Sequence, residues 1–198
     1  SERWGGFSGV DDVGKTGSHF TLFEMMAHHA FNFPGKFIYF KDECIQYNYE
    51  RLTAGLGIPP EEITFVEDVW AGGGNFGPSI EYFVRGLELG NQVFMQFEQL
   101  PDGSSRELKT TVIDHGTGLE RYPWLCNGTS TSYDVVFPRV LDKLYHATGF
   151  KPDKDVLKKF YLFAGKFDVT EIEDTAEMWR SAASFAGVDV ETLMKEVN

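Results

Sequence analysis

The sequence has few cysteines, few basic residues and no long hydrophobic run, and each shortage excludes a class of protein. Two cysteines, Cys44 and Cys126, form neither a disulfide framework nor a metal-ligand spacing, so each is expected to be a small buried hydrophobic residue. No apolar run approaches the roughly 20 residues that a membrane span needs, and no signal peptide opens the chain. We therefore expect a cytoplasmic protein.

Basic residues are outnumbered by acidic ones, with 18 lysines and arginines against 30 aspartates and glutamates, a net charge of −12. That balance argues against strong nucleic-acid binding by this chain alone, because affinity for phosphates comes largely from clustered lysine and arginine. It does not exclude ATP, whose charge a few arginines and Mg²⁺ can meet, nor tRNA contacts made by other parts of a longer protein. The 198 residues suffice for one domain plus a small appendage.

The pattern of apolar, glycine and proline residues predicts an α+β chain, with strands first and helices later. A glycine-rich loop is expected over 1–20, and the next residues read as a strand that turns into a helix near Ala27. A helix is expected over 41–57. The remaining expected elements are a strand at 63–66, a loop at 70–78, strands at 79–84, 87–97 and 107–113, and helices at 131–144, 151–165, 170–187 and from 189 on.

One stretch carries more chemistry than the rest, Val112-Ile-Asp-His-Gly-Thr-Gly-Leu-Glu-Arg121. Gly116 and Gly118 lack a Cβ, so a ligand can come close to the backbone of this predicted turn. Arg121 supplies a planar charged group suited to phosphate or to stacking on a ring, and Asp114 supplies an anion that could hold an ammonium group. Glycine spacing alone is weak evidence.

In combination, Asp-x-Gly-x-Gly-Leu-Glu-Arg resembles the third signature motif of class II aminoacyl-tRNA synthetases, in the form of the alanyl-tRNA synthetase family. Three further segments resemble that family in the same order: 13–26, 70–81 and 91–97. The sequences at Met25–Phe31 and at the triple glycine resemble those of the archaeal branch of the family. The resemblance covers most of residues 3 to 148, and beyond about 148 it transfers no residue.

The resemblance implies a role for each matching residue. Asp114 would pair with the alanine ammonium group, and Asn91 would hydrogen-bond the alanine or the adenylate. Arg121 would contact the adenine ring or the γ-phosphate, and Gly118 would let the backbone approach the nucleotide. Trp70 looks like the tryptophan that lines the aminoacyl-adenylate pocket. No metal ligand is implied.

The second motif of the family places an aromatic ring near the adenine and an arginine at the α-phosphate. Phe23, the end of a His-x-x-x-Phe piece, is the candidate for the ring, and Arg3 is the candidate arginine. An ungapped match to archaeal relatives would put Gly6 there instead. Phe20, Leu89 and Gly90 complete the nucleotide-binding set, although Phe20 stands where histidine is common and Gly90 where tryptophan is common. Ser18 replaces a frequent arginine.

The implied fold is a class II synthetase-like antiparallel sheet flanked by helices over 1–122, followed by a helical segment over 123–198 that resembles the start of the tRNA-recognition region. The implied activity is ATP- and Mg²⁺-dependent activation of alanine and its transfer to alanine tRNA, with Arg3 and Arg121 as catalytic residues. A membrane partner is not implied, and homo-oligomer formation stays open.

Two other functions remain open. An adenylate-forming paralogue that loads another amino acid or acceptor would suit Ser18, Phe20 and Gly90. A non-catalytic nucleotide- or RNA-binding module would suit glycine in place of the motif-two arginine. The family's first motif, editing domain and C-terminal domain have no match here, so the chain is expected to be a catalytic fragment or a diverged stand-alone relative.

Overall fold

The computed structural model describes the backbone of residues 2–5, 13–14, 17–164 and 175–197. The chain divides into two compact units, one made of Ser1–Arg3 with Glu24–Arg121 and the other of Trp4–Phe23 with Tyr122–Asn198. No helix in the described ranges is both long enough and apolar enough to cross a membrane. The first unit holds the sheet that carries the predicted site, and the second unit is mostly helical.

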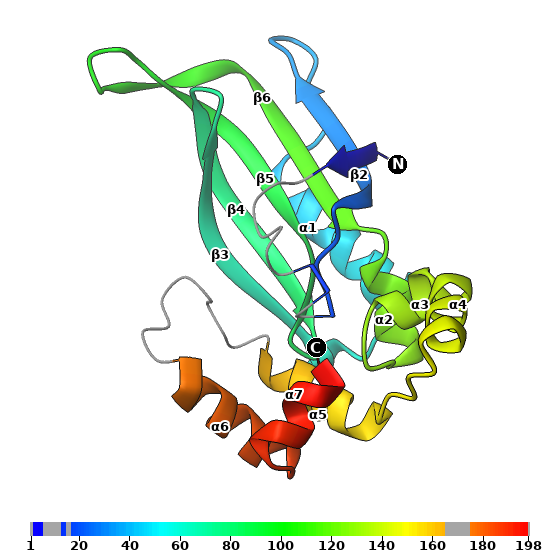
Figure 1. The fold of residues 1–198 in the computed structure, drawn as a ribbon. Coiled ribbons are helices and arrows are strands. Elements are labelled where there is room, and N and C mark those ends of the chain that lie inside the picture. The colour runs from blue at the N-terminus through cyan, green and yellow to red at the C-terminus, as the bar shows by residue number, and fades with distance from the viewer. Residues whose placement is uncertain (1, 6–12, 15–16, 165–174, 198) are drawn as a thin grey trace. The chain divides into compact units, whose positions relative to one another are not determined.

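Six strands form one sheet in the order β1-β2-β6-β5-β4-β3 (Figure 1). The pairings of β2 with β6, β6 with β5, β5 with β4 and β4 with β3 are all antiparallel. Their bounds are β1 Glu2–Gly5, β2 Leu22–Asn32, β3 Ile63–Gly72, β4 Asn75–Val84, β5 Leu87–Gln99 and β6 Ser105–Gly118. These elements confirm the α+β class and the antiparallel sheet flanked by helices that the sequence predicts.

Tight turns connect β3, β4 and β5, and positive backbone φ angles explain the glycines in them. Gly73 and Gly74 alone join β3 to β4, at φ 59° and 83°. Arg85 and Gly86 join β4 to β5, at φ 52° and 82°. Two consecutive residues with positive φ match the right-handed twist of a hairpin, and glycine adopts this conformation without a steric penalty.

Several sequence predictions about the strands are wrong. The chain does not become helical near Ala27, because β2 continues to Asn32 and pairs with β6 along that length. The predicted loop over 70–78 is a hairpin whose turn takes only two residues, so Trp70 lies in β3. The expected turn at Gly116 and Gly118 is the end of strand β6. Short β1 interrupts the loop predicted over 1–20.

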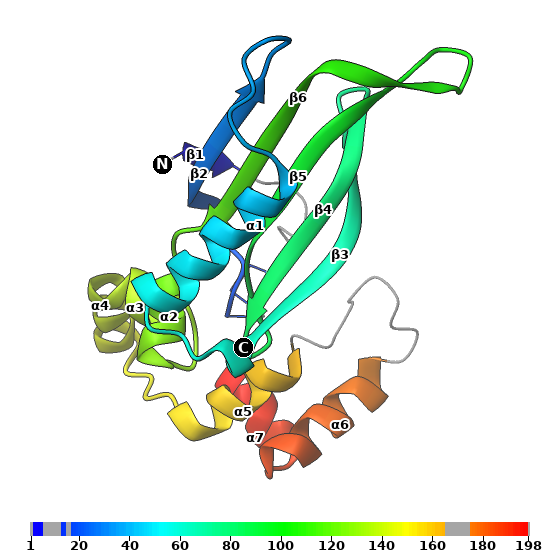
Figure 2. The same ribbon diagram turned by 180° about the vertical axis from the view of Figure 1, so that it is seen from behind.

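Helix α1 (Lys41–Glu50) covers one face of the sheet, and a π-helical turn over Arg51–Gly55 extends it (Figure 2). Cys44, Asn48 and Leu52 are almost fully buried, and their spacing of four places them on one side of the helix. Cys44 packs in a core cluster with Ala30, Phe94 and Ile113, which come from β2, β5 and β6. The predicted helix at 41–57 and the burial of Cys44 are confirmed.

A buried polar network also joins α1 to the sheet. The Gln92 side-chain amide donates to the Cys44 carbonyl at 2.8 Å and accepts from the Asn48 amide at 3.3 Å. The Arg51 guanidinium donates to Asn48 Oδ1 at 2.9 Å and to the Tyr82 hydroxyl at 3.2 Å. Because each of these buried groups has a partner, the network fixes the helix without leaving an unsatisfied amide.

The second unit contains six helices in its described part. These are α2 (Arg121–Asn127, whose first residue belongs to the first unit), α3 (Tyr133–Val136), α4 (Pro138–Thr148), α5 (Lys154–Ala164), α6 (Thr175–Ala186) and α7 (Val190–Val197). The single helix predicted over 131–144 is wrong, since it breaks at Phe137, where Pro138 disfavours the helical conformation of the preceding residue.

The other helix predictions for this unit mostly hold. Helix α5 ends close to the predicted position, Gly187 stops α6 at φ 77°, and the Asp189 carboxylate accepts from the Thr192 backbone amide at the start of α7, at 2.8 Å. The capping box predicted at Thr170 lies outside the described residues. Cys126 is exposed, so the prediction that it is buried is wrong.

Candidate active site on the face of the sheet opposite helix α1

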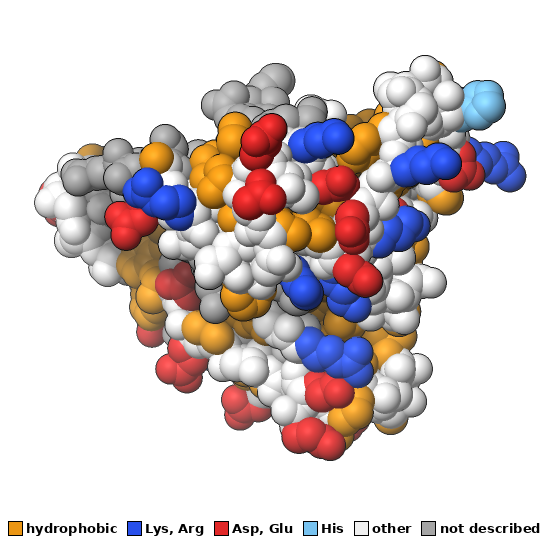
Figure 3. Space-filling model, turned by 60° about the horizontal axis from the view of Figure 1, so that its bottom comes forward, with side chains coloured by type: hydrophobic (Ala, Val, Ile, Leu, Met, Phe, Trp, Pro, Cys, Tyr) orange, Lys and Arg blue, Asp and Glu red, His pale blue; other side chains and the backbone are white. Residues whose placement is uncertain are grey.

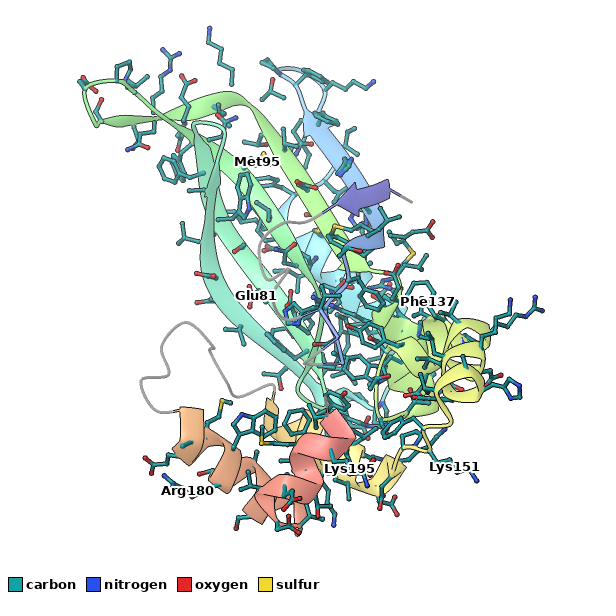
Figure 4. All side chains as sticks on the ribbon, viewed as in Figure 1. Glu81, Met95, Phe137, Lys151, Arg180 and Lys195 are labelled. Carbon is teal, nitrogen blue, oxygen red and sulfur yellow. The ribbon has the colours of Figure 1, made fainter. Side chains whose placement is uncertain are left out.

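Residues that face one another across antiparallel strands project from the same side of the sheet, so the register assigns side chains to faces. One row runs Asp68, Ser79, Val93, Asp114, His29 across β3, β4, β5, β6 and β2. The next row on that face runs Val66, Glu81, Asn91, Gly116, Ala27. This face lies opposite α1, and Figure 4, in which Glu81 and Met95 are labelled, is viewed from that side.

Asp114 and His29 form the central polar contact of this face. His29 Nε2 lies 2.9 Å from Asp114 Oδ1, and the two side chains are 37% and 41% exposed. The pair follows from the register, because His29 stands directly opposite Asp114 between β2 and β6. A half-exposed carboxylate on a sheet face, with one oxygen held by an imidazole, can still bind a small cationic ligand through its other oxygen.

Asn91 lies one row from Asp114 and beside Gly116. A Cβ on Gly116 would stand 2.7 Å from the Met25 methyl carbon and 4.0 Å from Asn91 Oδ1. The Met25 methyl therefore packs over Gly116 where a side chain would stand, and the Asn91 amide lies beside it. The structure thus brings Asn91 and Asp114 together as diagonal neighbours across β5 and β6.

Arg121 folds back over the end of β6. Its Nη1 donates to the Glu88 carbonyl oxygen at 2.9 Å and lies 3.2 Å from Glu88 Oε2. A Cβ on Gly118 would stand 3.0 Å from Arg121 Cδ, so the glycine provides the space through which the arginine side chain passes. With 40% of its side chain exposed, Arg121 is positioned by Glu88 and remains accessible to an anion.

Carboxylates concentrate next to this arginine. Burial raises the pKa of Glu81, the negative charges of Glu88 and Asp68 raise it further, and Arg121 opposes the shift. Sites of this kind attract a counter-charge, since each carboxylate makes ionisation of its neighbours harder. Mg²⁺ fits the donor type, because it binds proteins through one or two carboxylates while retaining water and substrate phosphates as its other ligands.

Three further predicted residues of the first unit, Trp70, Leu89 and Gly90, lie in strands β3 and β5. Trp70 shares its face with Asp68, two residues away on β3, and its ring covers Gly72, whose Cβ would stand 2.6 Å from a ring carbon. Leu89 is fully buried, and its carbonyl accepts from the Thr117 hydroxyl at 2.6 Å. Gly90 stands between Tyr82 and Thr117, where a Cβ would lie 2.2 Å from the Gly116 carbonyl oxygen. The site cannot accept a side chain at position 90 without movement of the backbone.

The predicted motif-two residues are Arg3 in β1, Phe23 in β2, and Phe20, which precedes β2. Phe20 belongs to the second unit, where its ring packs edge-on against Tyr133 and Phe137, at centroid distances of 5.3 and 6.0 Å. Phe23 is half-buried in β2 and is also assigned to the second unit. Arg3 contributes its backbone to β1, and its side chain lies outside the described residues. Gly6, the alternative to Arg3, also lies outside them.

Comparison with known families and proteins places this face in context. The family model described as "tRNA synthetases class II (A)" matches residues 3–180. The chain belongs to that family. The match spans the sheet, the motif from Asp114 to Arg121 and most of the helices, so the resemblance noted in the sequence is confirmed at the level of the family.

Curated relatives of this class II synthetase chain include several alanine--tRNA ligases from archaea. That of Methanocella arvoryzae is 53% identical over 93% of this chain and 21% of the relative, and that of Pyrobaculum aerophilum is 48% identical over 91% and 20%. The chain thus spans about a fifth of the length of these relatives. Pyrrolysyl-tRNA synthetase from Desulfitobacterium hafniense matches in structure with a TM-score of 0.38, at 15% identity over 61% of this chain and 39% of that one, too low a score to bear on the fold.

Three residues of this synthetase face were not selected from the sequence: His29, Glu81 and Glu88. Because a helix was predicted near Ala27, His29 was not recognised as a site residue. Only the strand register places His29 opposite Asp114. Glu81 and Glu88 lie at the ends of two strands joined by a two-residue turn, and that spacing was readable.

Proposed function

We propose that this chain is the catalytic-domain portion of an alanine--tRNA ligase, which activates alanine with ATP and transfers it to alanine tRNA. The observation that carries the proposal is the placement of Asp114 and Asn91 as diagonal neighbours on one face of the sheet, with Gly116, which has no side chain, directly opposite Asn91. The 53% identity to the alanine--tRNA ligase of Methanocella arvoryzae supports it. A cytoplasmic location goes with this activity.

Asp114 is the proposed anchor for the ammonium group of alanine. His29 holds Oδ1 at 2.9 Å, which fixes the carboxylate plane and leaves Oδ2 for the ligand. Asn91 is one row away and would hydrogen-bond the alanine or the adenylate through its amide. A ligand held at these two points presents its own carboxylate as the nucleophile, so the chemistry requires no nucleophilic side chain and depends on orientation.

The nucleotide is proposed to lie toward Arg121. Its guanidinium would meet the adenine ring or the γ-phosphate, and exchange of Glu88 for the nucleotide would release an ion pair that is worth little at the surface. Trp70 would line the adenylate pocket and Gly118 would allow close approach of the backbone. Arg3 at the α-phosphate, Phe20 and Phe23 at the adenine, and the backbone at Leu89 and Gly90 complete the proposed nucleotide set.

Activation joins the alanine carboxylate to the α-phosphorus of ATP and expels pyrophosphate. Negative charge develops on the phosphates during this step, and positively charged groups fixed in place before the reaction stabilise it most effectively. We assign that work to Arg121 and Arg3. Glu81 and Glu88 are the residues that would hold Mg²⁺, which when bound neutralises phosphate charge.

The tRNA is proposed to bind mainly through parts of a longer protein. The chain carries a net charge of −12, and acidic side chains are spread among the lysines and arginines of the face drawn in Figure 3. We assign residues 1–122 to the catalytic core and 123–198 to the start of the tRNA-recognition region. Helices α2 to α7 all lie between Arg121 and Val197, which supports that division.

A second candidate function, adenylate formation with a different amino acid, is favoured by Gly90. The position has no room for the tryptophan common in the family, since even a Cβ would meet the Gly116 carbonyl at 2.2 Å. Binding of non-hydrolysable aminoacyl-sulfamoyl adenosines, measured by calorimetry, separates the two. Tightest binding of the alanyl compound supports the alanine enzyme, and tighter binding of the seryl or glycyl compound supports the paralogue. Binding of ATP with no preference among the compounds would support a nucleotide-binding module.

A further inference from the structure

A cluster of metal-ligand side chains lies on the face of the sheet that α1 covers, away from Asp114. His28 of β2, Cys44 of α1 and His115 of β6 each offer one ligand atom, and the three atoms lie within 4.8 Å of one another. His28 and His115 face each other across the strand pair, with ring centroids 4.5 Å apart. Cys44 Sγ lies 3.8 Å from His28 Nε2. All three residues belong to the first unit.

The cluster contains an unsatisfied buried nitrogen. His115 is 3% exposed, and its Nε2 lies 2.9 Å from the Tyr82 hydroxyl. Its Nδ1 is buried without a hydrogen-bond partner among the described residues. Leaving such a group unpaired costs about 1–3 kcal/mol, and native structures contain few of them. A bound ion would supply the missing partner.

We propose that His28, Cys44 and His115 form a binding site for a transition-metal ion of the Zn²⁺ type. One sulfur and two imidazole nitrogens are the donors that Zn²⁺ prefers, whereas Mg²⁺ and Ca²⁺ require oxygen ligands. Tetrahedral Zn²⁺ with its usual bond lengths separates sulfur and nitrogen ligands by roughly 3.5 Å. The 3.8 Å between Cys44 Sγ and His28 Nε2 is close to that value, and the widest pair must close by about 1 Å.

The surroundings favour the ligand forms of both histidines. Burial, the neighbouring His28 and Arg51 lower the pKa of His115 to about 3, and burial, Arg51 and His29 lower the pKa of His28. Both rings are therefore neutral at pH 7, as a metal requires. The Tyr82 hydroxyl holds the Nε2 side of His115, the type of outer contact that orients a ligating imidazole and leaves Nδ1 for the ion.

Cys44 would lose its proton when the ion binds. Burial raises the pKa of its thiol in the metal-free chain, while the Gln92 amide, which donates to Sγ at 3.0 Å, stabilises the thiolate. The thiol proton leaves to solvent as the sulfur–metal bond forms, so one positive charge on the ion is neutralised. The nearby Arg51 cation repels a metal ion, and the negative charge of the Cys44 thiolate offsets that repulsion.

The bound ion would stabilise the proposed active site from the opposite face of the sheet. His28 precedes His29 in β2, and His115 follows Asp114 in β6, so the ion would join the two strands whose opposite face carries the Asp114–His29 pair. It would also attach both strands to α1 through Cys44. The ion therefore stabilises the register of the site and takes no part in amino-acid activation.

Cobalt titration of the chelator-treated 198-residue chain tests the site, because Co²⁺ bound to a thiolate gives a charge-transfer absorption band. The expected result is a band that saturates at one equivalent, is lost in Cys44→Ser and is retained in Cys126→Ser, whose cysteine is exposed. Absence of the band from the unaltered chain, or loss of it in Cys126→Ser with retention in Cys44→Ser, would overturn the proposal.

A second measurement covers the case in which Cys44→Ser does not fold. Zn²⁺ should raise the thermal unfolding midpoint of the unaltered chain, and Mg²⁺ at the same concentration should not. His28→Gln changes a half-buried residue and should fold, and it should lose most of the Zn²⁺ effect. An equal Zn²⁺ shift in His28→Gln and the unaltered chain would rule out this site.

Discussion

Asp114 and His29 meet across β6 and β2 with 2.9 Å between Oδ1 and Nε2, on the face of the sheet that no described helix of the first unit covers. The sequence motif predicts that Asp114 binds the amino acid. Its partner His29 can be identified only from the strand register. The pair orients one carboxylate at the centre of the proposed site.

Replacement of Asp114 by asparagine should weaken alanine binding without unfolding the chain. A charge-assisted hydrogen bond to an ammonium group is worth about 2 kcal/mol, so the KM for alanine should rise roughly 30-fold. Steady-state activation kinetics at varied alanine concentration measure this. Asp102→Asn, in the exposed turn before β6, is the matched control and should leave the KM unchanged. An unchanged KM in Asp114→Asn would remove Asp114 from the site.

Gly90→Ala should destabilise the fold by about 2 kcal/mol, as overpacking commonly does. Its Cβ would stand 2.2 Å from the Gly116 carbonyl oxygen, which is backbone and cannot rotate away. Urea unfolding monitored by circular dichroism measures the loss. Gly55→Ala is the control, because its Cβ would lie 3.9 Å from the nearest atom. Equal stability of the two variants would mean that β5 and β6 shift apart easily.

Gly118→Ala should raise the KM for ATP, and Arg121→Ala should raise it more. The added Cβ would press on Arg121 Cδ at 3.0 Å, and the flexible side chain can partly move aside, whereas truncation removes the guanidinium altogether. We expect an increase of about 3-fold for the first and about 30-fold for the second, the scale of a lost charged hydrogen bond. Unaltered ATP kinetics in Arg121→Ala would contradict the assignment of that residue to the nucleotide.

Stability should depend on pH through Glu81. Burial, Glu88 and Asp68 raise the pKa of its carboxyl in the folded chain, so the folded state binds this proton more tightly than the unfolded state. The contribution of Glu81 to the free energy of unfolding is therefore greatest below its unfolded pKa of 4.5 and is lost as pH rises through the raised folded value.

Urea unfolding of Glu81→Gln across pH 4 to 8 measures this effect. The variant should be more stable than the unaltered chain at pH 7, by about 0.3 kcal/mol for a partly exposed charge, and the difference should vanish toward pH 4. Glu107→Gln, on the exposed part of β6, serves as the control. A Glu81→Gln variant that loses stability at pH 7 would contradict the clustering of carboxylates.

Local pattern predicted most of the elements but not their register. Helix α1, strands β4 and β5 and the last helices follow from apolar spacing and from stop signals such as Gly187. Two errors have one cause: the segments around Ala27 and Trp70 are ambiguous in isolation, and pairing with β6 and β4 makes both of them strands.

The sequence predicted individual site residues, and the structure shows which residues lie next to them. Asp114, Asn91 and Arg121 were chosen by motif, and their proximity depends on which residues face each other across β5, β6 and β2. His29 and the His28–Cys44–His115 cluster were not predicted, because their members come from elements far apart in the sequence. Spacing along the chain carries no signal for such a cluster.

The most direct test of the central claim is amino-acid-dependent exchange of pyrophosphate into ATP, measured with Mg²⁺ and this chain over a panel of amino acids. The proposal predicts that alanine stimulates exchange most strongly and that Asp114→Asn requires far more alanine for the same rate. Stimulation mainly by another amino acid, or ATP binding with no exchange by any amino acid, would contradict the assignment of this chain to alanine activation.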